Sequence, residues 1–234
     1  MRSFDFESMT AEACYRLMVS SIVPRPIAWV VSRSGAGVLN AAPYSFFNMM
    51  GSEPPILAIG ALPGRVGHKD TVANVRESGE FVVNLVPDGL KEAMNATGID
   101  APPEIDELAH AGIETTRSTK VGPPRVRDSP VAFECRTVQL IETGPRQTLV
   151  LGQVVMAHFA ETVLTDGERP RVRTEARTSQ PLFGLMRRLK KYLPPSTMSV
   201  AGGPTRSKAL PTRRERSLIT ISRTSIAARS GSPN

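Results

Sequence analysis

The sequence is poor in cysteine, with only Cys14 and Cys135 among its 234 residues. Two thiols this far apart form neither a disulfide framework nor the closely spaced pairs of a structural zinc site. We therefore expect two reduced thiols and no metal centre, as is usual for a cytoplasmic protein.

Long apolar runs are also missing. The sequence contains no run of 18 apolar residues, so it predicts no membrane-spanning helix. The first residues include the acids Asp5, Glu7 and Glu12, whereas a secretory signal begins with basic residues followed by an apolar core. Together these absences predict a globular cytoplasmic protein without a membrane partner.

Acidic residues become scarce near the end of the chain. Residues 1–174 hold 17 Lys and Arg against 20 Asp and Glu, but residues 175–234 hold 12 against 2. The basic segment is also rich in Ser, Thr and Pro, and it shows no sustained apolar period. Such a segment cannot bury enough apolar surface to offset its ordering entropy. We predict one folded domain at 1–174 and a largely disordered segment at 175–234. The disordered segment can arise from a shifted reading frame or be a lineage-specific tail, and the sequence leaves both origins open.

Apolar and β-branched segments, separated by Gly, Pro and Ser, fill residues 1–174. The expected strands lie at residues 27–31, 38–43, 56–62, 81–86, 131–142 and 148–160. The expected helices lie at residues 8–20, 70–78, 88–97 and 105–111. Short strands with helices in their connections predict a mainly β protein with short helices, in the form of a closed β-barrel.

Two short motifs between these elements predict a cofactor site. Residues 44–48 (YSFFN) are expected to form a turn that offers a hydroxyl, an amide and aromatic faces to a flat ring. Residues 68–71 (HKDT) open a helix whose first N–H groups, lysine and threonine suit a phosphate. Together the motifs indicate a phosphorylated planar cofactor. The same residues can also be core packing around a tight turn and a solvated helix cap, and spacing alone does not choose.

Several segments, taken in order, resemble one known family. They are IVPRPIAWV, NAAPYSFFN, EPPILAIG, HKDTVANV and GEFVVNLV, extended by EAMNAT and SPVAFECRTV. They are similar to the flavin reductase-like family of FMN-binding split barrels, in its flavoredoxin-type branch, over roughly residues 10–170. The resemblance implies a Greek-key split barrel, usually dimeric, that binds FMN. In the family a closing segment with a glycine pair and a tyrosine follows, and Gly202-Gly203-Pro204 lacks that context.

The resemblance also implies which residues hold the phosphate. Lys69 and Thr71 would bind it together with backbone N–H groups at the helix start, and Asp70 would cap or orient that turn. Ser52 and Arg25 are further candidates for contact with the cofactor.

A second group of residues would contact the flavin ring. Ser45 and Asn48 would hydrogen-bond the isoalloxazine edge or the ribityl chain, and the backbone groups of Phe46 and Phe47 would line the ring. Trp29 would lie nearby, although a tryptophan in mid-strand is as readily explained as core. No catalytic side chain is expected, because the flavin carries the redox chemistry and hydride passes between stacked rings.

The function implied is that of an FMN-dependent NAD(P)H oxidoreductase, which passes electrons to a partner oxygenase or another electron acceptor protein. The alternative is a non-catalytic FMN-binding electron-transfer protein that another protein reduces. A more distant alternative is a nucleic-acid-binding protein that uses the basic segment. That segment has only two aromatic residues, Phe183 and Tyr192, and no recognisable reading motif, so no specific nucleic acid is expected.

Overall fold

The computed structural model describes residues 1–64, 67–99 and 101–165, all within the compact unit Met1–Leu193. The main sheet contains β1 (Ala28–Arg33), β2 (Leu39–Tyr44), β3 (Phe47–Ser52), β4 (Pro55–Ala61), β5 (Glu80–Asn84), β8 (Val131–Gly144) and β9 (Gln147–Phe159). A small ribbon contains β6 (Thr115–Thr116) and β7 (Arg125–Val126). The α-helices are α1 (Ala11–Ser21), α2 (Asp70–Ser78), α3 (Lys91–Ala96) and α4 (Glu107–His110), with 3-10 turns at Asp88–Leu90 and Glu161–Val163.

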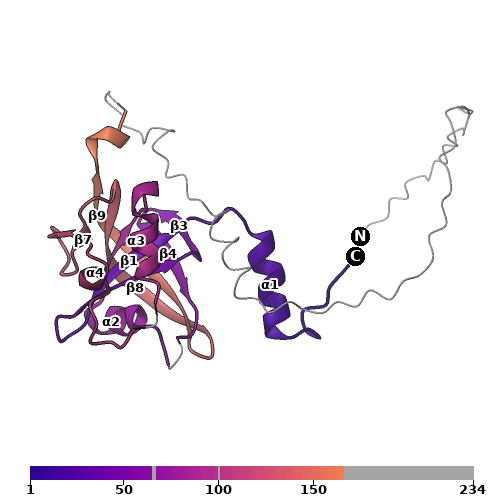
Figure 1. Cartoon of the computed structure of the whole chain (residues 1–234). Helices are drawn as coiled ribbons and strands as arrows, with labels where there is room; N and C mark the ends of the chain where they lie inside the picture. Colours follow the sequence, from indigo (N-terminus) through magenta and orange to yellow (C-terminus); the bar gives the residue numbers. More distant parts are fainter. Residues whose placement is uncertain (65–66, 100, 166–234) are drawn as a thin grey trace, which may run out of the picture. The chain divides into compact units, whose positions relative to one another are not determined.

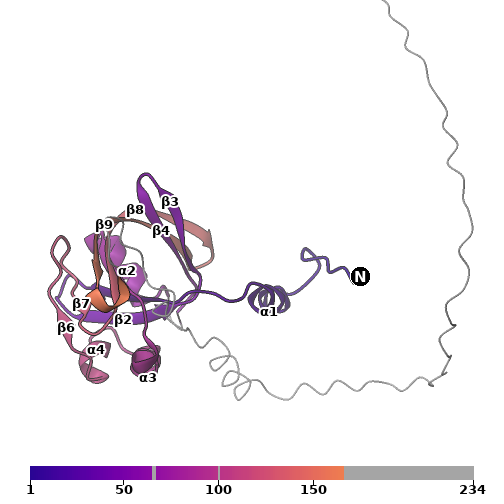
Figure 2. The same ribbon diagram turned by 90° about the horizontal axis from the view of Figure 1, so that it is seen from above.

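The strand order of the main sheet is β2-β1-β5-β8-β9-β4-β3, and all neighbouring strands are antiparallel. Strands β2 and β3 lie at opposite ends of this order, yet only Ser45 and Phe46 separate them in the chain. A flat sheet of this width would place them more than about 25 Å apart, which two residues cannot span. The sheet therefore curls into a barrel (Figures 1 and 2). The predicted mainly β split barrel with short helices is confirmed.

Both faces of the central strands are buried. Along β1, Ala28 and Val30 join one apolar cluster, whereas Trp29 and Val31 join a second cluster on the opposite face. The first cluster includes Val72 and Val75 of α2. The second cluster is covered by α3 and α4, which contribute Met94 and Leu108. The near-continuous apolar run predicted for the strand at 81–86 has the same cause, because β5 also contributes to both clusters.

Helix ends follow the sequence signals closely. The Thr10 hydroxyl accepts a bond of 3.3 Å from the Ala13 N–H at the start of α1. Helix α2 begins at Asp70, with Lys69 as its N-cap residue, and ends at Gly79, whose φ of 70° is left-handed. These bounds agree with the predicted helix at 70–78, and they fix where the first N–H groups of α2 lie.

The segment expected as a turn at 44–48 is shorter than predicted. Tyr44 ends β2 and Phe47 begins β3, so that only Ser45 and Phe46 form the turn. Strand β3 was not predicted because its sequence, FNMMGS, has no apolar alternation. Pairing with β4, from Phe47 opposite Ile59 to Ser52 opposite Pro55, supplies the backbone partners that make it a strand.

Two sequence predictions concern other parts of the chain. The predicted boundary at 174 and the predicted disorder of residues 175–234 lie outside the described residues. Within the described ranges, none of the helices has the length and apolar character that crossing a membrane requires.

Candidate functional site

A cavity of about 90 Å³ lies where β2, the start of α2, the end of α3 and the start of α4 meet. Lys69, Asp70 and Thr71 line it from the start of α2, and Tyr44 lines it from the end of β2. The structure thus brings the HKDT motif next to the first residue of the YSFFN motif, as the two-motif hypothesis requires.

A buried polar network forms one wall of this cavity. Glu107, which is 3% exposed, accepts hydrogen bonds from Asn40 Nδ2 at 2.9 Å and from the Ala41 N–H at 3.1 Å. The Thr71 hydroxyl donates to Asn40 Oδ1 at 2.7 Å. A carboxylate only accepts hydrogen bonds, so Glu107 fixes the orientation of the Asn40 amide and thereby the direction of the Thr71 hydroxyl. Burial raises the pKa of Glu107 above its ordinary value, and these hydrogen bonds oppose the rise.

The same network continues into the barrel. The Ser32 hydroxyl donates to Asn40 Oδ1 at 3.4 Å and accepts from Asn74 Nδ2 at 3.1 Å. Side chains from β1, β2, α2 and α4 are therefore joined by one chain of buried hydrogen bonds. This arrangement holds the start of α2 in a fixed position against β2.

Tyr44 is a buried aromatic residue that lines the same cavity. Tyr44 is 8% exposed, and its hydroxyl makes no short hydrogen bond among the described residues, although the side chain of Thr71 acts on it as a hydrogen-bond partner that lowers its pKa. Burial raises the pKa of Tyr44 to about 12, so the hydroxyl remains a protonated donor at neutral pH.

The β2–β3 turn carries the remaining ring-binding candidates next to Tyr44. Ser45, Phe46 and Phe47 are half-buried, and Asn48 is exposed. Asn48 Oδ1 accepts a bond of 2.8 Å from the Met49 N–H, which is the local turn role that was the alternative to cofactor contact. The centre of the Phe46 ring lies 5.7 Å from the Arg25 guanidinium carbon. Arg25, in the segment before β1, therefore packs against this half-buried ring.

Two predicted site residues lie elsewhere. Trp29 is fully buried on the opposite face of β1, and its indole N–H donates to the Thr97 hydroxyl at 2.9 Å. It therefore packs behind the cavity wall and holds Thr97, which lines the cavity. Ser52 is exposed at the far end of β3, about 16 Å along the strand from Phe47 at the usual rise per residue.

Sequence reasoning missed Asn40, Tyr44, Thr97 and Glu107 as lining residues. The first two lie inside the quoted NAAPYSFFN segment, where attention to the polar positions of an otherwise apolar strand would have found them. Glu107 follows Asp106, whose side chain caps α4 by accepting from the Ala109 N–H. That cap signal marks a helix start but gives no indication that the helix meets β2.

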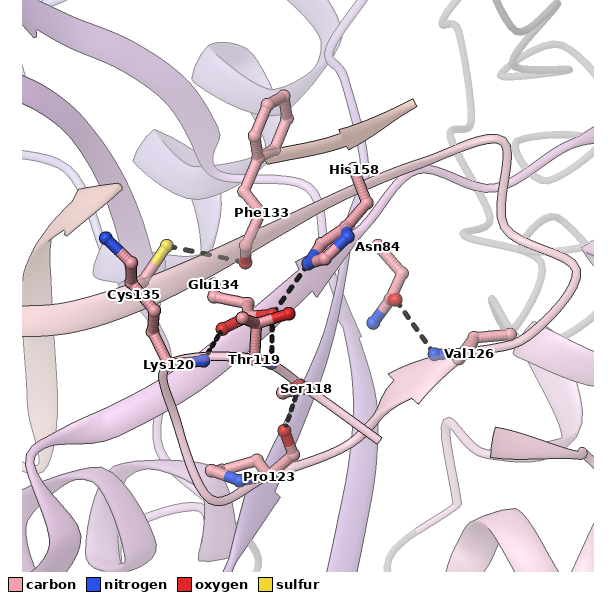
Figure 3. A network of polar contacts seen from close by, with 10 residues as sticks. All are labelled: Asn84, Ser118, Thr119, Lys120, Pro123, Val126, Phe133, Glu134, Cys135 and His158. Carbon is pink, nitrogen blue, oxygen red and sulfur yellow. Dashed lines mark hydrogen bonds and ion pairs between the residues drawn. The ribbon is translucent and has the colours of Figure 1, made fainter. Parts of the chain in front are cut away.

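A second buried polar cluster lies apart from this cavity (Figure 3). Glu134 is fully buried and accepts from the N–H groups of Thr119 and Lys120 at 2.7 and 2.6 Å. His158 Nε2 lies 2.6 Å from the same carboxylate. Burial alone would raise the pKa of Glu134, but these three partners together hold it below its ordinary value. The cluster fastens the loop after β6 to β8 and β9, so His158 has a structural partner there.

No group of three or more His, Cys, Asp and Glu side chains is placed to hold a metal ion in the residues that the structure describes.

Comparison with known proteins gives consistent matches. The flavin reductase like domain family matches residues 19–173. An uncharacterized protein of Deinococcus radiodurans is 39% identical over 178 residues, which cover 74% of this chain and 78% of that protein.

Two solved structures are also similar. The 2-nitrobenzoate 2-nitroreductase NbaA of Pseudomonas fluorescens is 38% identical, over 74% of this chain and 83% of that one, with a TM-score of 0.66. The nitrilotriacetate monooxygenase component B of Bacillus cereus is 33% identical, over 75% of this chain and 88% of that one, with a TM-score of 0.71.

Proposed function

Because the chain belongs to the flavin reductase-like domain family, we propose that it is an FMN-dependent NAD(P)H oxidoreductase. In this role it binds FMN noncovalently, accepts hydride from NADH or NADPH, and passes electrons to an acceptor. The observation that carries the proposal is the cavity where the start of α2 meets the end of β2, directly beside the β2–β3 turn. FAD in place of FMN is the main alternative for the cofactor.

The residues around the cavity fit a flavin that is only partly enclosed. A cavity of about 90 Å³ has room for a polar group of the ligand. We assign the ring to the turn formed by Ser45 and Phe46, next to the cavity, because the YSFFN motif predicts ring contacts there. Tyr44 and Thr71 line this cavity with polar groups, which supports the proposal that part of the ligand enters it.

A bound flavin would supply the hydride chemistry. The protein's part is to bind and orient the ligand. Lys69 and the first N–H groups of α2 attract the phosphate, since a helix start favours negative charge. Thr71 contributes mainly its backbone N–H. The residue is only 4% exposed, and its hydroxyl already donates a hydrogen bond to Asn40. The network from Glu107 through Asn40 keeps this helix start in place.

Anaerobic titration of the purified protein with NADH and with NADPH tests the proposal. We expect a flavin absorbance spectrum that bleaches on addition of one of the two nucleotides. Flavin that is bound but not reduced by either nucleotide would favour the second candidate, a non-catalytic electron carrier. A protein that binds neither FMN nor FAD would contradict both.

The phosphate assignment has a separate test. Lys69→Ala should weaken FMN binding by about 10-fold or more, because a charge-assisted phosphate contact is lost. Riboflavin, which lacks the phosphate, should bind the variant as it binds the original protein. Lys91→Ala is the matched control, since the Lys91 side chain is 42% exposed and pairs with Asp88. Equal FMN affinity in the Lys69 variant would exclude this role for the side chain.

The electron acceptor is proposed to be a second protein, such as an oxygenase. One relative is the component B of a monooxygenase, and another is a nitroreductase. Oxidation of the reduced protein by a nitroaromatic compound, compared with its oxidation by free FMN, would distinguish a direct reductase from a supplier of reduced flavin.

A further inference from the structure

Glu107 places a buried negative charge beside the start of α2. The residue is 3% exposed and lines the same cavity as Lys69 and Asp70. Its oxygens accept from Asn40 Nδ2 and from the Ala41 N–H, and its own N–H is a further donor. Three donors around one carboxyl group match the ionised form, which can only accept hydrogen bonds. A carboxylate therefore lies next to the proposed phosphate site.

A carboxylate in this place would weaken phosphate binding if it acted only through its charge. Like charges repel strongly where little water separates them, and Asp70 adds a second acidic group to the same cavity wall. The hydrogen bonds of Glu107 give it a second effect on the phosphate site, because they reach the start of α2 through other side chains.

The hydrogen bonds between Glu107 and α2 all run in one direction. Asn40 donates to Glu107 through Nδ2, so its Oδ1 faces the other way. This oxygen accepts from the Thr71 hydroxyl at 2.7 Å and from the Ser32 hydroxyl at 3.4 Å. Asn74 Nδ2 in turn donates to the Ser32 oxygen at 3.1 Å. Thr71 and Asn74 both belong to α2, so the carboxylate at the end of this chain determines how α2 is hydrogen-bonded to β1 and β2.

We propose that Glu107 is a positioning residue for phosphate binding, and that its charge strengthens the binding by fixing the direction of this hydrogen-bond chain. The inference rests on the proposed function, because the phosphate is that of the flavin, bound by Lys69 and the first N–H groups of α2. A helix start binds phosphate through N–H groups at fixed positions, and the chain holds these groups against β2. The gain from a fixed helix start exceeds the repulsion between carboxylate and phosphate.

Glu107→Gln tests the proposal, because it keeps the size of the side chain and removes the charge. The Ala41 N–H needs the new amide oxygen as its acceptor, so the new NH₂ group faces Asn40 and makes that amide turn round. Asn40 then presents its own NH₂ group to Thr71 and Ser32, and both hydroxyl protons lose their acceptor. Unpaired buried donors are costly, so the start of α2 shifts away from β2.

The affinities of the variant for FMN and for riboflavin are measured by quenching of flavin fluorescence. We expect Glu107→Gln to bind FMN about 5- to 10-fold more weakly and to change the affinity for riboflavin, which has no phosphate, by less than about 2-fold. If Glu107 acted only through its charge, the variant would bind FMN more tightly. The sign of the change therefore separates the two roles.

The double variant Asn40→Asp with Glu107→Gln should restore binding. The carboxylate at position 40 accepts from the amide at position 107 and still accepts from Thr71 and Ser32, while the Ala41 N–H keeps its acceptor. The total charge equals that of the original protein. FMN affinity should return to within about 2-fold of the original value. A residue that served only general stability would not be rescued in this specific way.

Glu134→Gln is the matched control, since Glu134 is also a buried carboxylate that accepts from two backbone N–H groups but does not line the cavity. It should lower stability and leave the ratio of FMN to riboflavin affinity unchanged. Thr71→Val breaks the same chain at its other end and decides the question if Glu107→Gln does not fold. It should weaken FMN binding by a similar factor, with riboflavin unchanged, and it should add nothing to the effect of Glu107→Gln where both fold.

Three results would overturn the inference while leaving the proposed function intact. Tighter FMN binding by Glu107→Gln would mean that charge repulsion dominates. Equal weakening of FMN and riboflavin would mean a general structural role. A folded double variant that does not recover FMN binding would mean that the direction of the chain is unimportant. Failure of the original protein to bind any flavin would overturn the inference and the proposed function together.

Discussion

At the scale of single residues, Glu134 carries a buried charge with a complete set of partners. Its carboxylate accepts from two backbone N–H groups and lies next to His158. A pKa held below the ordinary value of 4.5 means that the folded state binds the proton less readily than the unfolded chain. The resulting stabilisation is present above about pH 4.5 and is lost as the pH falls through the lower, folded-state pKa.

We expect Glu134→Gln to lower the free energy of unfolding at pH 7 by about 2–3 kcal/mol. The variant loses the charged acceptor, and the new amide NH₂ group would face the donors that the carboxylate accepted from. The difference from the original protein should shrink at pH values below about 4. Urea denaturation at both pH values measures this. Glu142→Gln is the control, since Glu142 pairs with Arg76 at the surface and should change stability by less than about 1 kcal/mol. A difference that does not depend on pH would contradict the charge argument.

The two cysteines should differ in reactivity. Cys135 is fully buried, and burial raises its pKa to about 12, so it offers almost no thiolate at neutral pH. Cys14 lies half-buried in α1. We expect one rapidly labelled thiol per folded chain, identified as Cys14 by mass spectrometry after maleimide treatment. Cys14→Ser should abolish rapid labelling, and labelling at Cys135 in the folded variant would be the contrary result.

Residues of the site could be assigned to one place from the sequence only where they belong to the same motif. Lys69, Asp70 and Thr71 are consecutive, so their common position at a helix start was predictable. Glu107 was not, because its contact with Asn40 exists only after α4 has packed on β2. Trp29 shows the reverse case, since an aromatic residue in mid-strand can face either side, and the choice depends on which face α3 covers.

At the scale of elements, the Phe81 side chain of β5 reaches past β8 and packs against Gly152 of β9. A Cβ atom at Gly152 would overlap the Phe81 ring and lie 3.3 Å from Cys135 Cβ. Phe81 is fully buried, so the ring has little space to move. This close approach is what allows the barrel interior to hold a phenyl ring between two strands.

Gly152→Ala should therefore lower the free energy of unfolding by about 1–3 kcal/mol through overpacking. Phe81→Leu in the same chain should recover part of the loss, which a double-mutant cycle in denaturant would measure. Gly89→Ala serves as the control, because a Cβ there meets no atom within 4 Å. A Gly152 variant as stable as the control would show that the ring has room to move.

Element prediction succeeded where a local signal was strong. Helix α2 has an acidic first residue and a glycine after its last turn, and its bounds were predicted to the residue. Strand β3 was not predicted, because Met49 and Met50 are both exposed and the sequence shows no apolar alternation there. Its existence depends on β4, so only the paired structure could show it.

At the scale of the whole molecule, we expect a homodimer, as the family resemblance implies. Exposed apolar side chains are consistent with this expectation, among them Met49, Met50 and Val138 at exposed fractions of 64, 62 and 56%. Light scattering at micromolar concentration should give twice the mass of the 25.3 kDa chain. A monomer mass under these conditions would be the contrary result. Lys91→Glu should leave the mass unchanged, and Met50→Glu should reduce it toward that of the monomer if β3 lies in the interface.

The strand order also determines when each strand can find its partners during synthesis of the protein. Strand β4 leaves the ribosome early, yet its second neighbour is β9, with Ile56 opposite Gln153. Until β9 has been translated, the nascent chain carries an unpaired apolar edge of the kind that attracts other chains. Three of the six strand pairs in the main sheet, β1 with β5, β5 with β8 and β4 with β9, join segments far apart in sequence. Such long-range pairs make closure of the barrel slow compared with folding of a helical protein of equal size. A ribosome that stalls before β9 would thus release an aggregation-prone fragment, and molecular chaperones would be needed during this interval.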